Sequence, residues 1–194
     1  MNGKATYETP GRAGVHPLQF VQWMLILSIV MMFAAFTSAY IVRSEEGDWL
    51  QVSLPSSMLL STGLIVFSSA TMQWGLFSAR RDNINHVKVA LLVTLALGVG
   101  FLAAQWNVWG DLVGQKVFFG GLGSNPAGSF LYVLTGVHGF HLVTGLIYLT
   151  IVLVSSFKYK VHSRNLLRIK LCTTYWHFLG GLWVYLHVFL LLNN

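Results

Sequence analysis

The chain has 194 residues, of which 55% are hydrophobic and only 9% carry a charge. Average soluble domains carry roughly 25% charged residues, so twelve Lys and Arg with six Asp and Glu are too few to cover a globule in water. The composition argues against a soluble enzyme, a nucleic-acid binder and a disordered protein, and it favours a membrane protein. The single cysteine, Cys172, excludes an intrachain disulfide and a cysteine-rich metal site.

Five long apolar runs follow one another along the chain. None contains Asp, Glu or Arg, and the one Lys is Lys88 at the very start of the third run, which we count with the loop before it. Runs of about twenty apolar residues are the primary signal of membrane-spanning helices. A β-barrel would need shorter, alternating segments. We therefore expect an all-α membrane protein, a bundle of five transmembrane helices that forms a single domain over residues 1–194. The expected spans are Leu18–Val42, Ser57–Ser78, Val87–Trp109, Ser129–Phe157 and Leu171–Leu192.

The first and fourth runs differ from the others in ways that bear on how they insert. The run Leu18–Val42 is too long for the core of a signal peptide and follows a polar stretch of seventeen residues, so we expect a retained helix. The run Ser129–Phe157 exceeds the length that a typical bilayer needs and should tilt or protrude on one side. All four prolines lie outside the runs, so none interrupts an expected helix.

The basic residues lie in alternate loops. The N-terminal tail, the second loop and the fourth loop hold ten of the twelve Lys and Arg, and the first and third loops hold the other two. Basic residues accumulate on the cytoplasmic side of a membrane protein. This count predicts a cytoplasmic N-terminus and a C-terminus on the opposite, periplasmic side, and it explains the net charge of +6 without a nucleic-acid partner.

Few polar groups lie inside the runs, and histidines are prominent among them. His138 and His141 are three residues apart, so they share one face of a helix. Such a face is typical of interhelical hydrogen bonding at a packed seam. Metal or haem ligation is the alternative, and it requires further ligands or a facing His at matched depth. His177 and His187 lie roughly 15 Å apart in depth, and neither pairs clearly with His141.

Four segments carry a more specific pattern. Gly128–Gly145 contains Gly-Ser-Phe, then Thr-Gly-Val-His-Gly-Phe-His, then Gly; Thr174–Phe178 reads Thr-Tyr-Trp-His-Phe and is followed by Trp183. Leu95–Gln105 and Ser28–Tyr40 complete the set. Taken in the order in which they occur along the chain, these segments cover essentially all of it and resemble the cytochrome c oxidase subunit III family in its five-helix bacterial form.

The resemblance implies a non-catalytic subunit of a respiratory haem-copper oxidase in a bacterial cytoplasmic membrane. Haem and copper would lie on subunits I and II, with only phospholipid bound to this chain. The chain would stabilise subunit I, and further small subunits or a partner respiratory complex are expected as neighbours. The implied seam or lipid-cleft residues are Gln105, His138, His141, Trp176 and His177, and the implied lipid head-group contacts are Lys158, Lys160 and His162.

The acids that the family carries inside the membrane are replaced in this chain. Their places fall at Ile29, at Gly180 and near Val108. Without these acids the scaffold and lipid roles remain, and a proton-handling role is disfavoured. Three other functions stay open: a haem- or quinol-binding membrane anchor of a dehydrogenase, subunit III of a quinol oxidase, and a transporter. The last would show internal symmetry and broken helices.

Overall fold

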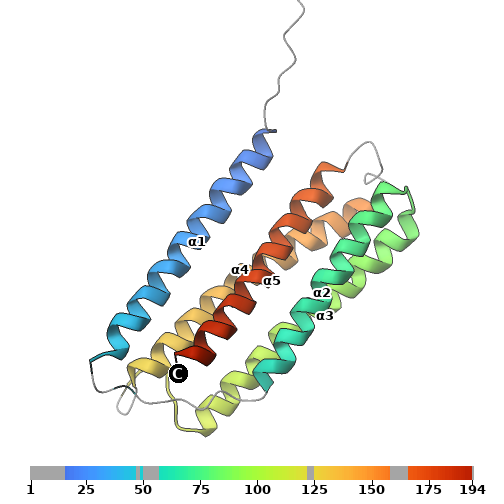
Figure 1. Cartoon of the computed structure of the whole chain (residues 1–194). Coiled ribbons are helices and arrows are strands. Elements are labelled where there is room, and N and C mark those ends of the chain that lie inside the picture. The colour runs from blue at the N-terminus through green and yellow to red at the C-terminus, as the bar shows by residue number, and fades with distance from the viewer. Residues whose placement is uncertain (1–15, 47–48, 50–56, 122–124, 158–165, 194) are drawn as a thin grey trace, which may run out of the picture.

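The computed structural model describes residues 16–46, 49, 57–121, 125–157 and 166–193. These residues form five helices and contain no strand, which confirms the all-helical prediction for this part of the chain. Each expected span lies within one helix, and most helices begin or end a few residues beyond it. The helices are α1 (Pro17–Ser44), α2 (Ser57–Arg80), α3 (Ile84–Gly114), α4 (Pro126–Phe157) and α5 (Leu167–Leu192) (Figure 1).

Polar side chains fix where α1 and α3 begin. The Nδ1 atom of His16 accepts the N–H of Leu18 at 3.2 Å, and Oε1 of Gln19 accepts the N–H of His16 at 3.3 Å. At the start of α3, Oδ1 of Asn83 accepts the N–H of His86 at 3.4 Å. These bonds satisfy backbone donors that the first turn of a helix leaves unpaired.

The helices α2 and α3 form a tight antiparallel hairpin. The turn between them places Asp82 at φ 54°, a left-handed conformation that Asp tolerates better than most residues. Gly75 of α2 lies so close to Ala90 of α3 that a Cβ at Gly75 would be 3.2 Å from the alanine Cβ. The short turn and the small residues together hold the two helices in contact along their length (Figure 1).

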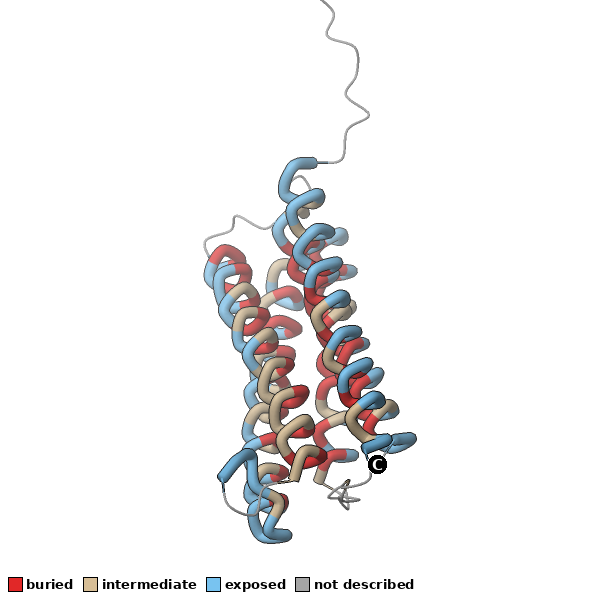
Figure 2. Tube along the Cα trace, turned by 90° about the vertical axis from the view of Figure 1, so that its left-hand side faces the viewer, coloured by how far each residue is buried: buried red, intermediate tan, exposed pale blue. Residues whose placement is uncertain are grey.

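The helix α1 stands to one side of the bundle. It contacts α4 and α5 and neither α2 nor α3, whereas α5 packs against both α2 and α4 (Figure 1). Its buried residues form one stripe at spacings of three and four, and most of its other residues are exposed apolar side chains (Figure 2). The stripe consists of Ile26, Ile29, Phe33, Thr37 and Tyr40.

Four helices, α1, α3, α4 and α5, are long and apolar enough to cross a membrane. The helix α2 falls below that level because it carries five serines, two threonines and Gln73. Its polar residues face inward in part, since Ser61 and Ser68 are fully buried, while Leu59 and Phe67 are about 70% exposed. The polar composition of α2 therefore follows from what it packs against, and its role as a fifth span remains a prediction.

The two ends of the bundle differ in chemistry. At one end, where α1, α3 and α5 begin, the described residues Arg80, Arg81, Arg168 and Lys170 are found; we call this the basic end. At the opposite end the ring of Tyr40 packs against several aromatic rings, and its hydroxyl donates to the carbonyl of Asn193 at 3.2 Å. These contacts fasten the end of α1 to the end of α5.

Candidate functional site

Trp176 of α5 lies at the centre of the bundle and is fully buried. Its Nε1 donates a hydrogen bond to Oγ of Ser68 in α2 at 3.1 Å. A Cβ at Gly98 of α3 would lie 2.8 Å from Cη2 of Trp176, and one at Gly145 of α4 would lie 3.5 Å from its ring. The indole thus fills the space that two glycines leave, and it joins three neighbouring helices to α5.

His138 of α4 is enclosed by aromatic rings from three other helices. Its ring centroid lies 6.5 Å from that of Phe33 in α1, 6.0 Å from that of Phe101 in α3 and 5.1 Å from that of Trp183 in α5. The residue is fully buried. These three rings pack against the imidazole, and none of the three can bind a metal.

His141, like His138, lies near the ring of Phe33, and unlike His138 it also has a polar contact. Its ring centroid is 6.0 Å from that of Phe33, so both histidines are on the side of α4 that meets α1. Its Nδ1 is 2.8 Å from the carbonyl oxygen of Val137, and because a carbonyl only accepts, Nδ1 is the donor of this bond. The predicted shared face is therefore present, and the backbone carbonyl satisfies one of the ring nitrogens.

Gln105 and His177 both bond to α2, at different levels. Nε2 of Gln105 donates to Oγ of Ser61 at 2.8 Å, and Nε2 of His177 lies 3.0 Å from Oε1 of Gln73. Neither side chain has a hydrogen bond or ring contact with His141 in the described part of the chain. The structure thus distributes the predicted seam residues along several helix contacts, and it does not gather them into one site.

The predicted head-group contacts Lys158, Lys160 and His162 lie outside the described residues.

Sequence reasoning missed the polar partners on α2. Oγ1 of Thr62 accepts the indole N–H of Trp183 at 3.0 Å, and Oγ1 of Thr71 is 2.8 Å from Oγ1 of Thr94 in α3. The spacing of seven between Ser61 and Ser68 was the available signal, because it places both hydroxyls on one face of a helix. That face is the one α2 turns to α3 and α5.

The three positions at which the resemblance expects acids are buried and apolar. Ile29 is 3% exposed in the stripe that α1 buries, and Val108 is fully buried in α3. A Cβ at Gly180 would lie 2.9 Å from Oγ of Ser69 in α2. A carboxylate at any of them would need space or a partner that the surrounding side chains do not supply.

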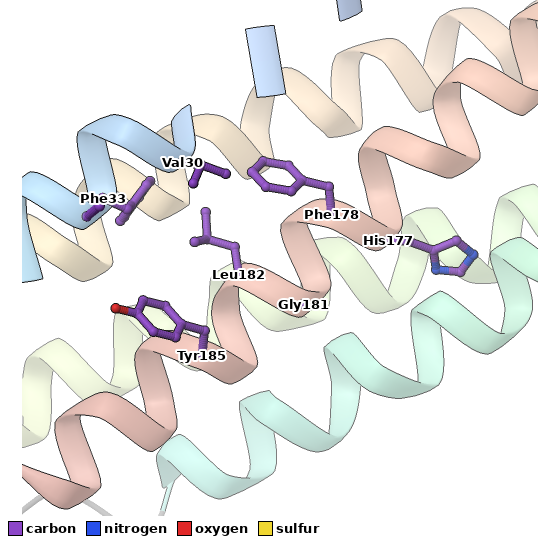
Figure 3. A pocket seen from close by; sticks show the side chains of 8 residues that line it. Val30, Phe33, His177, Phe178, Gly181, Leu182 and Tyr185 are labelled. Atoms are coloured by element: carbon purple, nitrogen blue, oxygen red, sulfur yellow. The ribbon is translucent and has the colours of Figure 1, made fainter. Parts of the chain in front are cut away.

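An apolar groove lies between α1 and α5, with a volume of about 430 Å³. Figure 3 shows Val30 and Phe33 facing Phe178 and Leu182 across it, while the ring of His177 points away toward α2. At its outer edge the hydroxyl of Tyr185 donates to Oγ1 of Thr37 at 3.2 Å. We call this feature the α1–α5 groove.

A second hollow of about 330 Å³ lies between the same helices and α4, closer to the basic end. Gln22, Thr144, Tyr148 and Tyr175 contribute polar atoms to its lining, and leucines and a valine supply the rest. Nε2 of Gln22 donates to the carbonyl of Leu171 at 2.8 Å and ties α1 to the start of α5. We call this hollow the polar part of the groove.

The lining of both hollows is mostly apolar, and its few polar side chains are not evenly distributed. Hydroxyl and amide groups lie near the basic end, and apolar side chains lie toward the middle of the helices. Arg168 and Lys170 are exposed just before the groove-lining Leu171. This order of cationic, hydrogen-bonding and apolar groups matches the order of phosphate, ester and acyl chain in a phospholipid. Among the described residues no three His, Cys, Asp or Glu side chains gather as a metal site would require.

Comparison with known proteins gives one consistent result. A family model described as cytochrome c oxidase subunit III matches residues 5–193. The chain is 28% identical over 190 residues to a protein named probable cytochrome c oxidase subunit 3 from Nocardia farcinica, covering 91% of this chain and 92% of that protein. It is 26% identical over 182 residues to cytochrome c oxidase subunit 3 of Rattus norvegicus, covering 88% of this chain and 67% of that protein.

Proposed function

Since this chain belongs to the cytochrome c oxidase subunit III family, we propose that it stabilises a haem-copper oxidase by packing against subunit I and by holding phospholipid in the α1–α5 groove. The chain is a subunit of a membrane-bound oxidase complex. In the proposal, haem and copper lie on subunits I and II, and this subunit contributes no catalytic group. Further small subunits or a partner respiratory complex complete its surroundings.

The proposal places all five helices across a bacterial cytoplasmic membrane as one domain. The basic end faces the cytoplasm and the C-terminus faces the periplasm, because the loops at the basic end hold most of the Lys and Arg. The helix α2 crosses the bilayer although it is the most polar helix, since its serines and threonines bond to side chains and carbonyls inside the bundle.

The distribution of polar and apolar side chains along the groove is the observation that supports lipid binding. An acyl chain in the apolar part would be in contact with Phe33, Phe178 and Leu182, and the many van der Waals contacts with these side chains would favour its binding. The amide of Gln22 has two N–H donors and uses one for the carbonyl of Leu171, so the other can donate to an ester carbonyl. Cations near the start of α5 favour an anionic phosphate at the cytoplasmic surface.

Of the five residues predicted for the seam or cleft, His177 lies on the groove lining and His141 beside Phe33. We propose that Gln105, His138 and Trp176 act as seam residues, since each is buried between helices. The predicted lipid role of the loop at 158–162 remains a proposal on charge alone.

A substitution that fills the groove tests the lipid proposal. Gly181 lines the apolar part, and a Cβ there meets no atom within 4 Å, so Gly181→Leu adds a side chain to the groove without a clash at Cβ. We expect the purified oxidase to retain less phospholipid per complex, measured by mass spectrometry, and to lose activity faster during turnover at an unchanged initial rate.

Gly110→Leu is the matched control. Gly110 also has no atom within 4 Å of an added Cβ, and it lies on α3, which does not contact α1. This variant should retain the wild-type lipid content. Equal lipid content in the Gly181→Leu variant and the wild-type oxidase would contradict lipid binding in the groove while leaving membership of the oxidase intact.

A further inference from the structure

Three buried side chains near the centre of the bundle have polar atoms without a hydrogen-bond partner among the described residues. These atoms are both ring nitrogens of His138, Oε1 of Gln105 and Nδ1 of His187. The three residues are exposed by only 0%, 6% and 7%. An unpaired polar group in a buried, apolar setting is costly, so such groups are nearly always satisfied by a partner or by ordered water.

Judged by their places along the helices, the three side chains differ in depth by about one helical turn. The ring of His138 packs against Phe101 of α3 and Trp183 of α5, whose centroids are only 4.9 Å apart. Gln105 follows Phe101 by four residues, and His187 follows Trp183 by four. Because α3 and α5 both begin at the basic end, each of these steps moves one turn in the same direction and keeps the same helix face.

Contacts with α2 also indicate that Gln105 and Trp183 lie at a similar depth in the bundle. Nε2 of Gln105 donates to Oγ of Ser61, and Nε1 of Trp183 donates to Oγ1 of Thr62. Ser61 and Thr62 are successive residues, so the amide of Gln105 and the indole nitrogen of Trp183 meet α2 at one height. The unpaired oxygen of Gln105 therefore belongs to the same region as the aromatic enclosure of His138.

No direct hydrogen bond joins these atoms to one another or to another described residue. A neutral imidazole has one donor and one acceptor, and Oε1 of Gln105 is an acceptor only. The rings of Phe33 and Phe101 have no donor or lone pair, and the indole N–H of Trp183 already donates to Thr62. Water offers two donors and two acceptors, and a buried water molecule typically makes two to four hydrogen bonds to polar groups such as these.

We infer that ordered water is bound inside the bundle between His138, Gln105 and His187. Its chemical role there is to donate to Oε1 of Gln105 and to bridge that oxygen to the ring nitrogens. The site is separate from the α1–α5 groove and independent of lipid binding. It would fix the orientation of the His138 ring where α3, α4 and α5 meet.

The direct test is a structure of the intact oxidase at a resolution that resolves ordered water. We expect density within hydrogen-bonding distance of Oε1 of Gln105 and of a ring nitrogen of His138 or His187. Side chains packed without such density, or a direct hydrogen bond between Gln105 and His138, would overturn the inference.

A thermodynamic cycle on the intact oxidase gives a second test. Gln105→Met and His187→Leu each remove one partner of the shared water, so the loss of melting temperature in the double variant should be smaller than the sum of the two single losses. Thr71→Val combined with His187→Leu is the control, because Thr71 bonds to Thr94 and should add independently. Additive losses for Gln105 and His187 would overturn the inference.

Discussion

The indole Nε1 of Trp176 donates to Oγ of Ser68, a residue 108 positions earlier in the chain, at 3.1 Å. The hydroxyl of Ser68 in turn donates to the carbonyl of Ile65 at 2.7 Å. Both residues are fully buried. This pair joins α5 to α2 at the point where glycines of α3 and α4 allow the large ring to enter.

Replacing Trp176 by Phe should destabilise the subunit. The smaller ring leaves part of the indole volume empty and removes the bond to Ser68, for an expected loss of about 1–3 kcal/mol. Ser68→Ala should also destabilise, because it leaves the indole N–H buried without an acceptor. In thermal unfolding of the purified oxidase the double variant should lose less than the sum of the two; strict additivity would show that the bond contributes nothing.

Gly98→Ala should destabilise the bundle through Trp176. The added Cβ would lie 2.8 Å from Cη2 of Trp176 and 2.8 Å from Cδ2 of Leu146. Overpacking of this kind typically costs about 1–3 kcal/mol. Gly63→Ala is the control, since its Cβ meets nothing within 4 Å and Ala favours a helix by up to about 1 kcal/mol over Gly. A melting temperature that is equal for the two variants would contradict the close packing around the indole.

His141→Leu should weaken assembly or lipid retention more than initial turnover. The substitution removes the imidazole that lies 2.8 Å from the carbonyl of Val137 and 6.0 Å from the ring of Phe33, a contact of α4 with α1. The measurements are subunit stoichiometry, lipid content and the initial rate of oxygen consumption. His86→Leu, at an exposed position, should change none of them. Early activity lost with assembly intact would count against a structural role for His141.

The orientation of the helices can be measured with single cysteines. Cys172 is buried and can be replaced by Ser to give a background without a cysteine. A membrane-impermeant maleimide added to spheroplasts should label Asn193→Cys at the C-terminal end if, as we propose, that end faces the periplasm. It should label Asn85→Cys, near the turn between α2 and α3, only after the membrane is opened. The reverse pattern would show that the loop charges gave the wrong orientation.

Hydropathy predicted all five helices because each contains a long, mostly apolar run with few or no charged residues. Hydropathy did not predict where the helices end, because side-chain hydrogen bonds such as that from His86 N–H to Asn83 extend α3 beyond its apolar core. The polar character of α2 was also not interpretable from its sequence alone. The hydroxyls of Ser61, Ser68 and Thr62 are favourable inside a membrane protein because they donate to carbonyls of α2 and accept from side chains of α3 and α5.

The histidine face on α4 was predictable from spacing, and the ring that it meets was not. His138 and His141 are three residues apart, which puts both on one helix face; that the face meets Phe33 depends on how α1 is placed in space. The same limit applies to Gln22 and Leu171, whose contact joins residues 149 positions apart. Sequence spacing predicts faces of one helix, whereas pairing between helices depends on their depth and rotation.

The central claim is that this chain is a subunit of a haem-copper oxidase and carries no redox centre itself. The most direct measurement is affinity purification of the tagged chain from native membranes, followed by protein identification and an absorption spectrum before and after the chain is separated from its partners. We predict that subunits I and II copurify with a haem spectrum and that the isolated chain shows none. Purification without those subunits, or a Soret band stoichiometric with the isolated chain, would contradict the claim.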